Sequence, residues 1–192
     1  MTIAEGLAYY LMRYCLGDGG YTNRWFKINF FWKFTLILPN ISNRREAVKF
    51  HDLHHVLTEY ETGLKGEAEI GAWEIASGCG KYWAAWLLNM GSLSYGFVLY
   101  PRAVYRAFIR GRHSKNLYHN ITYASPLLET SVAEMRKRLH IPANAPSATV
   151  SDIVAFISWR VLVLTMVMVE LGLLVLFVQA MTGFKLHFLC FL

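Results

Sequence analysis

Cysteine is scarce in this sequence, and the few cysteines form no motif. Cys15, Cys79 and Cys190 are far apart, and no Cys-x-x-Cys pair occurs. The chain therefore has no cysteine-based zinc or redox motif. We expect buried or free thiols in a reducing compartment.

Strand signals are also weak, because no run alternates apolar and polar residues next to a hairpin dipeptide. Residues 24–38 are rich in Phe, Trp and Ile, but crossing a bilayer takes about 20 apolar residues. We interpret this segment as a core or interfacial segment. Helical patterns, which predict an all-α fold, cover residues 3–16, 42–60, 67–80, 82–109 and 126–139, and Ser42 or Asn43 is the expected cap of the second helix. Gly91 and Pro101 are candidate break points within 82–109.

Charged residues are few, at 17 %, while apolar residues make up 55 % of the chain. Average globular domains have roughly 25 % and 45–50 %. The net charge of +6 suits an anionic membrane surface, and no nucleic-acid-binding module is recognisable. The composition predicts a helical body with one membrane element and no nucleic-acid partner.

The N-terminus lacks the basic start, apolar run and small-residue cleavage site of a secretory signal. It carries Glu5, Arg13 and Asp18, and it is not the Arg- and Ser-rich stretch of a mitochondrial presequence. We therefore expect a bacterial protein, or a mature form, on the cytoplasmic face of the inner membrane.

Val161–Met181 is a long apolar segment whose only charge is Glu170. Its length is sufficient to cross a bilayer; a buried core helix or a helix packed in a homodimer is the alternative. The basic residues 136–138 precede it, which places residues 1–160 in the cytoplasm. We divide the chain into a helical metal-binding and quinone-precursor-binding domain, 1–142, and a linker with the apolar membrane segment, 143–192.

A cluster of metal-ligand types is the most informative local feature. His51 and His55 are one helical turn apart and so share a face. Asp52 lies beside the first, and Glu67 follows a turn containing Gly63 and Gly66. The residues predict a divalent-metal site formed by His51, Asp52, His55 and Glu67. Zinc suits these ligands best, and iron or manganese also fits.

Two residues of the cluster have alternative interpretations. Asp52 is either a ligand, the partner that orients a histidine, or the catalytic group for proton transfer. His54 completes an HxxHH box of the kind found in membrane di-iron enzymes, but those need several such boxes. We expect His54 to point away from the metal.

The pattern H-D-x-x-H-x(11)-E, present here as His51, Asp52, His55 and Glu67, resembles the hallmark of the coenzyme Q four family of ubiquinone biosynthesis. The likeness covers about residues 20–142, and the C-terminal segment is not part of it. The resemblance implies an all-helical fold, zinc or a similar ion on these residues, and an apolar channel for a polyprenyl tail.

Two functions are attached to that family. One is a lyase activity, the oxidative decarboxylation of ring C1 in a polyprenylated 4-hydroxybenzoate-derived precursor. The other is a non-catalytic scaffold that binds the lipid and organises the other ubiquinone biosynthesis enzymes at the membrane. A metal-dependent lipid hydrolase is a third reading, which rests on the site alone.

Arg102, Arg106 and Arg110 recur every four residues and therefore share one helix face. We expect this face to bind anionic lipid headgroups or the anionic group of a substrate, with a solvated surface as the alternative.

Overall fold

The computed structural model describes residues 1–30 and 34–182, and these contain eight helices. The protein is 66 % helical, which confirms the all-α prediction. The helices are α1 Ile3–Arg13, α2 Ser42–Thr58, α3 Leu64–Ser77, α4 Trp83–Leu99, α5 Pro101–Arg112, α6 Ser125–Glu129, α7 Val132–Arg138 and α8 Val150–Thr182. Cys190, for which a buried or free thiol was expected, lies outside the described residues.

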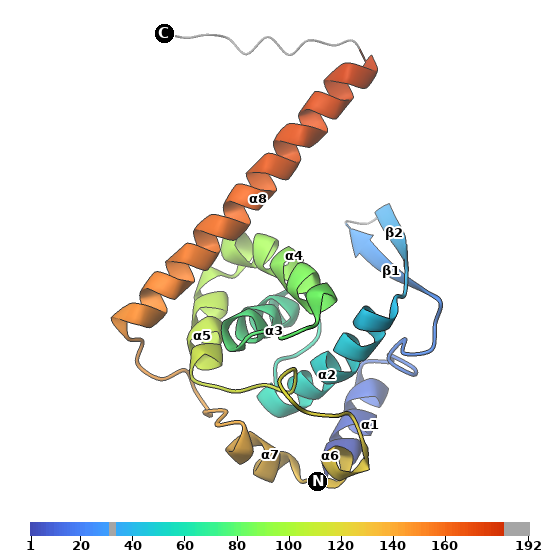
Figure 1. Ribbon diagram of the computed structural model, residues 1–192, viewed down its shortest axis with the longest axis vertical. Helices are drawn as coiled ribbons and strands as arrows, with labels where there is room; N and C mark the ends of the chain where they lie inside the picture. Colours follow the sequence, from blue (N-terminus) through green and yellow to red (C-terminus); the bar gives the residue numbers. More distant parts are fainter. Residues whose placement is uncertain (31–33, 183–192) are drawn as a thin grey trace.

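Helix α3 occupies the centre of the body and packs against both α4 and α5 (Figure 1). The contact with α5 is so close that it requires glycine: a Cβ on Gly111 would lie 2.4 Å from the carbonyl oxygen of Trp73. Helices α1 and α2 pack on each other beside this group. The chain's N-terminus lies near α6, away from the free end of α8.

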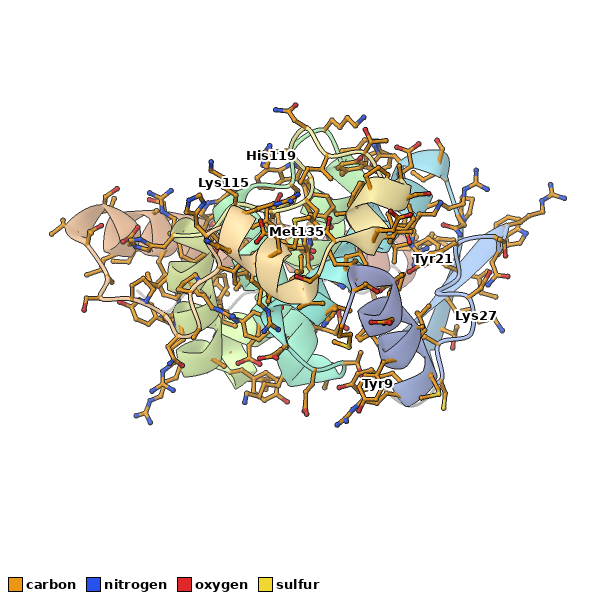
Figure 2. The ribbon with its side chains drawn as sticks, turned by 90° about the horizontal axis from the view of Figure 1, so that it is seen from below. Tyr9, Tyr21, Lys27, Lys115, His119 and Met135 are labelled. Atoms are coloured by element: carbon orange, nitrogen blue, oxygen red, sulfur yellow. The ribbon has the colours of Figure 1, made fainter. Side chains whose placement is uncertain are left out.

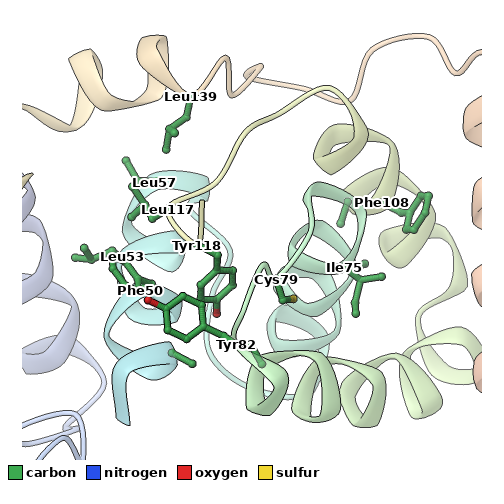
Figure 3. Close-up of a cluster of buried hydrophobic side chains, with 14 of the residues drawn as sticks. Phe50, Leu53, Leu57, Ile75, Cys79, Tyr82, Phe108, Leu117, Tyr118 and Leu139 are labelled. Carbon is green, nitrogen blue, oxygen red and sulfur yellow. The ribbon is translucent and has the colours of Figure 1, made fainter. Parts of the chain in front are cut away.

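Figure 3 shows part of the hydrophobic core, in which side chains of α2 lie beside Tyr82 and Tyr118. Phe50, Leu53 and Leu57 recur on one side of α2, and each is at most 3 % exposed. The loop after α5 adds Leu117 and Tyr118 to the same core. Apolar contacts thus hold one face of α2 in the core. His51 and His55 lie on the neighbouring face of the same helix.

A two-stranded antiparallel hairpin replaces the expected core segment at residues 24–38. Strands β1 (Trp25–Phe30) and β2 (Phe34–Pro39) pair with Trp25 opposite Pro39. Aromatic and β-branched residues favour strands, and residues 26–30 also alternate apolar and polar types, although no hairpin dipeptide follows them. Trp25 and Ile37 are 60 % and 54 % exposed, so the core interpretation was wrong for them.

The helix termini also differ from the sequence prediction. Ile41 is the N-cap of α2 and has no side-chain capping bond. Asn43 instead accepts a hydrogen bond from the Ala84 amide at 3.1 Å, which joins the beginnings of α2 and α4. The expected helix 82–109 is interrupted before Pro101, which has no amide hydrogen and begins α5.

Helix α8 begins well before the predicted membrane segment. Phe156 packs edge-on against Phe97, Tyr105 and Phe108, at 5.0–5.7 Å between ring centroids. From Val169 to Met181 almost every side chain is exposed. Within the described residues, one helix, Val150–Met181, is long and apolar enough to cross a membrane. Its first turns are therefore part of the body, and its later turns project from it.

Hydrogen bonds to Asp152 stabilise the first turn of α8. Its carboxylate accepts hydrogen bonds from Arg112 Nε at 3.1 Å, His113 Nε2 at 3.0 Å and the Thr149 amide at 3.0 Å. The Thr149 hydroxyl in turn accepts from the Asp152 amide at 3.2 Å, which completes a capping box.

We expect Asp152→Asn to lower the free energy of unfolding by about 1–2 kcal/mol, because it removes the charged cap and the ion pair. Thermal unfolding in detergent measures this. Glu129→Gln, an exposed site with the same change of charge, is the matched control. Equal stability of the two variants would contradict the role of Asp152.

Candidate metal centre

Two adjacent helices form the site. His51 and His55 project from one face of α2, and their Nε2 atoms are 3.2 Å apart. Glu67, in the first turn of α3, places its carboxylate oxygens 3.5 Å from His51 Nε2 and 3.6 Å from His55 Nε2. Donor atoms of these three residues all lie within 4.8 Å of one another.

The turn between α2 and α3 allows Glu67 to reach the histidines. Glu59 ends α2 in the left-handed conformation, and Gly63 has a positive φ of 102°. A Cβ on Gly66 would lie 1.6 Å from the Glu61 carbonyl oxygen, so only glycine fits there. The glycines seen in the sequence therefore set the return path of the chain.

Hydrogen bonds fix which nitrogen of each ring faces the site. His51 Nδ1 lies 3.0 Å from Glu74 Oε1, and His55 Nδ1 lies 2.8 Å from the Tyr60 carbonyl oxygen. Both acceptors require a hydrogen on Nδ1. The two Nε2 atoms therefore face each other without a backbone or Glu74 partner. Their lone pairs repel at 3.2 Å unless a proton or a metal cation lies between them.

The spacing suits a metal ion. A tetrahedral ion about 2.0–2.1 Å from two imidazole nitrogens places them about 3.3 Å apart. The 3.2 Å between the Nε2 atoms is close to that value. The distances from the Glu67 oxygens to the two Nε2 atoms, 3.5 and 3.6 Å, are similar to this nitrogen–nitrogen distance. Glu67 lies on the partly exposed side of the site.

Glu74 is the residue that sequence reasoning missed. It is fully buried on α3, and its carboxylate contacts four side chains, namely His51, His54, Asn89 at 2.5 Å and Tyr118 at 3.0 Å. Burial alone would raise its pKa, but the histidines hold the pKa well below its usual range. Glu74 lies two helical turns after Glu67, and this periodicity was the available signal.

His54 lies away from the metal-ligand group, as expected. It is fully buried, with Nδ1 2.6 Å from Glu74 and Nε2 accepting from the Leu117 amide at 3.0 Å. Both nitrogens are thus occupied, and burial lowers its pKa. His54 is a neutral residue that joins α2, α3 and the loop after α5.

Asp52 does not join the three converging ligands. Its carboxylate accepts a hydrogen bond of 2.6 Å from the Tyr21 hydroxyl. Burial raises the pKa of Asp52 to about 6, against the lowering effects of His51 and Tyr21. Asp52 is therefore a buried acid, next to His51 in the chain, whose pKa lies closer to neutrality than that of an ordinary aspartate.

The charges within the site shift the pKa values of its two histidines in opposite directions. Burial would lower the pKa of His51, but Glu74 and Glu67 outweigh it and raise that pKa well above its usual value. Burial and the charge of His51 lower the pKa of His55 to about 4. The negative charge of Glu67 and Glu74 thus favours a cation at this site, and a metal ion would compete for it with a proton on His51.

Arg110 does not belong to the expected basic face. It is 9 % exposed and donates to the carbonyl oxygens of Pro142 at 2.7 Å and Thr58 at 2.8 Å. The carbonyl groups at the end of α2 need donors, and this guanidinium supplies one. Only Arg102 and Arg106 of the three arginines remain exposed.

No protein-family model, curated protein or solved structure matches this chain.

We expect the purified protein to bind about one divalent metal per chain and the double variant His51→Ala/His55→Ala to bind none, because two of the three converging ligands are lost. Elemental analysis of dialysed samples measures this. His140→Asn is the control, because Asn tolerates the positive φ of 55° at that exposed site. Equal metal content in the double variant would refute the site.

Glu74→Gln should weaken metal binding about 10- to 100-fold, because the neutral amide orients His51 less strongly and lowers its basicity. Competition with a chromogenic chelator measures the affinity, and circular dichroism checks folding. Glu69→Gln, the same change elsewhere on α3, should leave affinity unchanged. A folded Glu74→Gln variant of wild-type affinity would rule out this orienting role.

Proposed function

We propose that this protein is a membrane-associated, metal-dependent lyase that removes the ring C1 carboxylate of a polyprenylated 4-hydroxybenzoate-derived precursor in ubiquinone biosynthesis. The observation that carries the proposal is the convergence of His51, His55 and Glu67, with Asp52 turned toward Tyr21. Three ligands leave a coordination position for substrate, which is typical of catalytic rather than structural metal sites. The H-D-x-x-H-x(11)-E resemblance supplies the substrate class.

The three ligands would hold a divalent ion, zinc best and iron or manganese as alternatives. A bound ion supplies Lewis acidity, which stabilises the negative charge of the substrate carboxylate or phenolate. Tyr10, whose ring stacks on His55 at 5.3 Å between centroids, keeps that imidazole oriented. Glu74 does the same for His51 through a charged hydrogen bond.

Asp52 is the group we assign to proton transfer. When the bond between the ring and the carboxylate breaks, carbon dioxide leaves and the ring carbon takes a proton, which the protonated Asp52 carboxyl gives. In the oxidative form of the reaction, water supplies the hydroxyl group that the ring carbon gains as carbon dioxide leaves, and dioxygen accepts two electrons and two protons and departs as hydrogen peroxide. Tyr21 holds the Asp52 carboxylate in place through its 2.6 Å hydrogen bond.

Helix α8 supports the proposed location at a membrane. A polyprenylated substrate resides in the bilayer, and α8 has the length and the exposed apolar surface to anchor the protein there. We propose the cytoplasmic face of a bacterial inner membrane, with the lipid and other ubiquinone biosynthesis enzymes as partners.

The second candidate is a non-catalytic scaffold that holds the same lipid. It is favoured by the position of Asp52 directly after His51 on α2, because a fourth protein ligand is what closes a structural metal site. The two functions differ in turnover: the scaffold binds the prenylated benzoate and releases no carbon dioxide.

For the enzyme, we expect Asp52→Asn to retain metal and lose roughly 100- to 10,000-fold in turnover, the range for loss of a general acid. Release of labelled carbon dioxide from a carboxyl-labelled prenyl-4-hydroxybenzoate, with metal-loaded full-length protein, measures it. Asp18→Asn, an exposed aspartate, is the control. If the wild-type protein binds the substrate but releases no carbon dioxide, the scaffold function is favoured. If Asp52→Asn keeps full activity, Asp52 is not the proton donor.

A further inference from the structure

A second region of the molecule is a cavity lined by arginine and aromatic side chains. A cavity of about 300 Å³ opens where α8 passes the junction of α4 and α5, a region that can be located in Figure 1. Three aromatic rings and three guanidinium side chains line it: Phe97, Tyr105, Phe156, Arg102, Arg106 and Arg160. Arg160 comes from α8, so the sequence pattern on α5 alone did not include it.

The positive charge of this cavity is not balanced by the protein. No acidic side chain lines it, and across residues 1–30 and 34–182 no carboxylate lies within 4.0 Å of Arg102, Arg106 or Arg160. All three side chains are exposed. Like charges that face one hollow repel each other, and a bound anion relieves that repulsion. Guanidinium groups form paired hydrogen bonds with phosphate oxygens.

The position of the cavity along α8 indicates where the anion comes from. Arg160 immediately precedes Val161 and Leu162, which are 60 % and 48 % exposed and begin the apolar run. If the apolar run lies in the hydrocarbon core, Arg160 is at the level of the lipid headgroups. The aromatic walls then face the glycerol and upper acyl carbons of a lipid, while the arginines face its phosphate.

We propose that this cavity binds the headgroup of an anionic phospholipid from the leaflet that α8 enters. The bound lipid joins α5 to α8 and fixes the body at the membrane surface. His51, His55 and Glu67 do not line the cavity, so this inference does not depend on the proposed metal chemistry.

The test uses full-length protein in detergent and three ligands: short-chain phosphatidylglycerol, short-chain phosphatidylcholine and inorganic phosphate. Calorimetric titration measures each affinity. We expect phosphatidylglycerol to bind at least tenfold more tightly than the other two. Arg102→Gln, Arg106→Gln and Arg160→Gln should each lose about fivefold in affinity, which is the contribution of one basic residue near an anionic lipid. The triple variant should lose about 100-fold, because the three contributions multiply.

A matched control removes three positive charges elsewhere, at Arg24, Lys115 and Lys137, each replaced by Gln. These residues are exposed and do not line the cavity, and Figure 2 shows Lys115 near the end of the body that carries α7. The control should keep wild-type affinity. If the triple cavity variant does not fold, the single variants decide. Undiminished binding in the cavity variants, or an equal loss in the control, overturns the proposal. Phosphate binding as tight as phosphatidylglycerol assigns the cavity to soluble phosphate compounds instead.

Discussion

The buried carboxylate of Glu74 is the constraint on which the site depends. A charged group without water is costly unless hydrogen bonds surround it, and here four side chains do so: His51, His54, Asn89 and Tyr118. They come from α2, α4 and the loop after α5, and Glu74 itself comes from α3. The same carboxylate therefore joins the body together and decides which nitrogen of His51 faces the metal centre.

The site follows from that arrangement. Once Nδ1 of His51 is engaged by Glu74, its Nε2 faces His55 Nε2 at 3.2 Å, and Glu67 is directed toward both by a turn that only glycine permits at position 66. Asp52, one residue further around α2, is engaged by Tyr21 instead. A site with three convergent ligands and an adjacent acid is more suited to chemistry than to a purely structural ion.

Sequence reasoning identified the helical class, the apolar C-terminal helix and the residues that converge, because each rests on local periodicity: a four-residue spacing, or a long apolar run. It missed what depends on contacts between distant segments. The burial of Arg110 is set by carbonyl groups of Thr58 and Pro142, and the role of Glu74 by partners from three other segments. The hairpin was missed because no turn dipeptide separates its strands, although residues 26–30 alternate apolar and polar side chains.

X-ray absorption spectroscopy of the metal-loaded protein tests the central claim most directly, because it counts the atoms around the ion. We expect two imidazole nitrogens and one carboxylate at about 2.0–2.2 Å from the ion, with solvent oxygens as the remaining ligands. Asp52→Asn should leave this spectrum unchanged. A spectrum without imidazole scattering, or a sphere closed by a second carboxylate that Asp52→Asn removes, would contradict it.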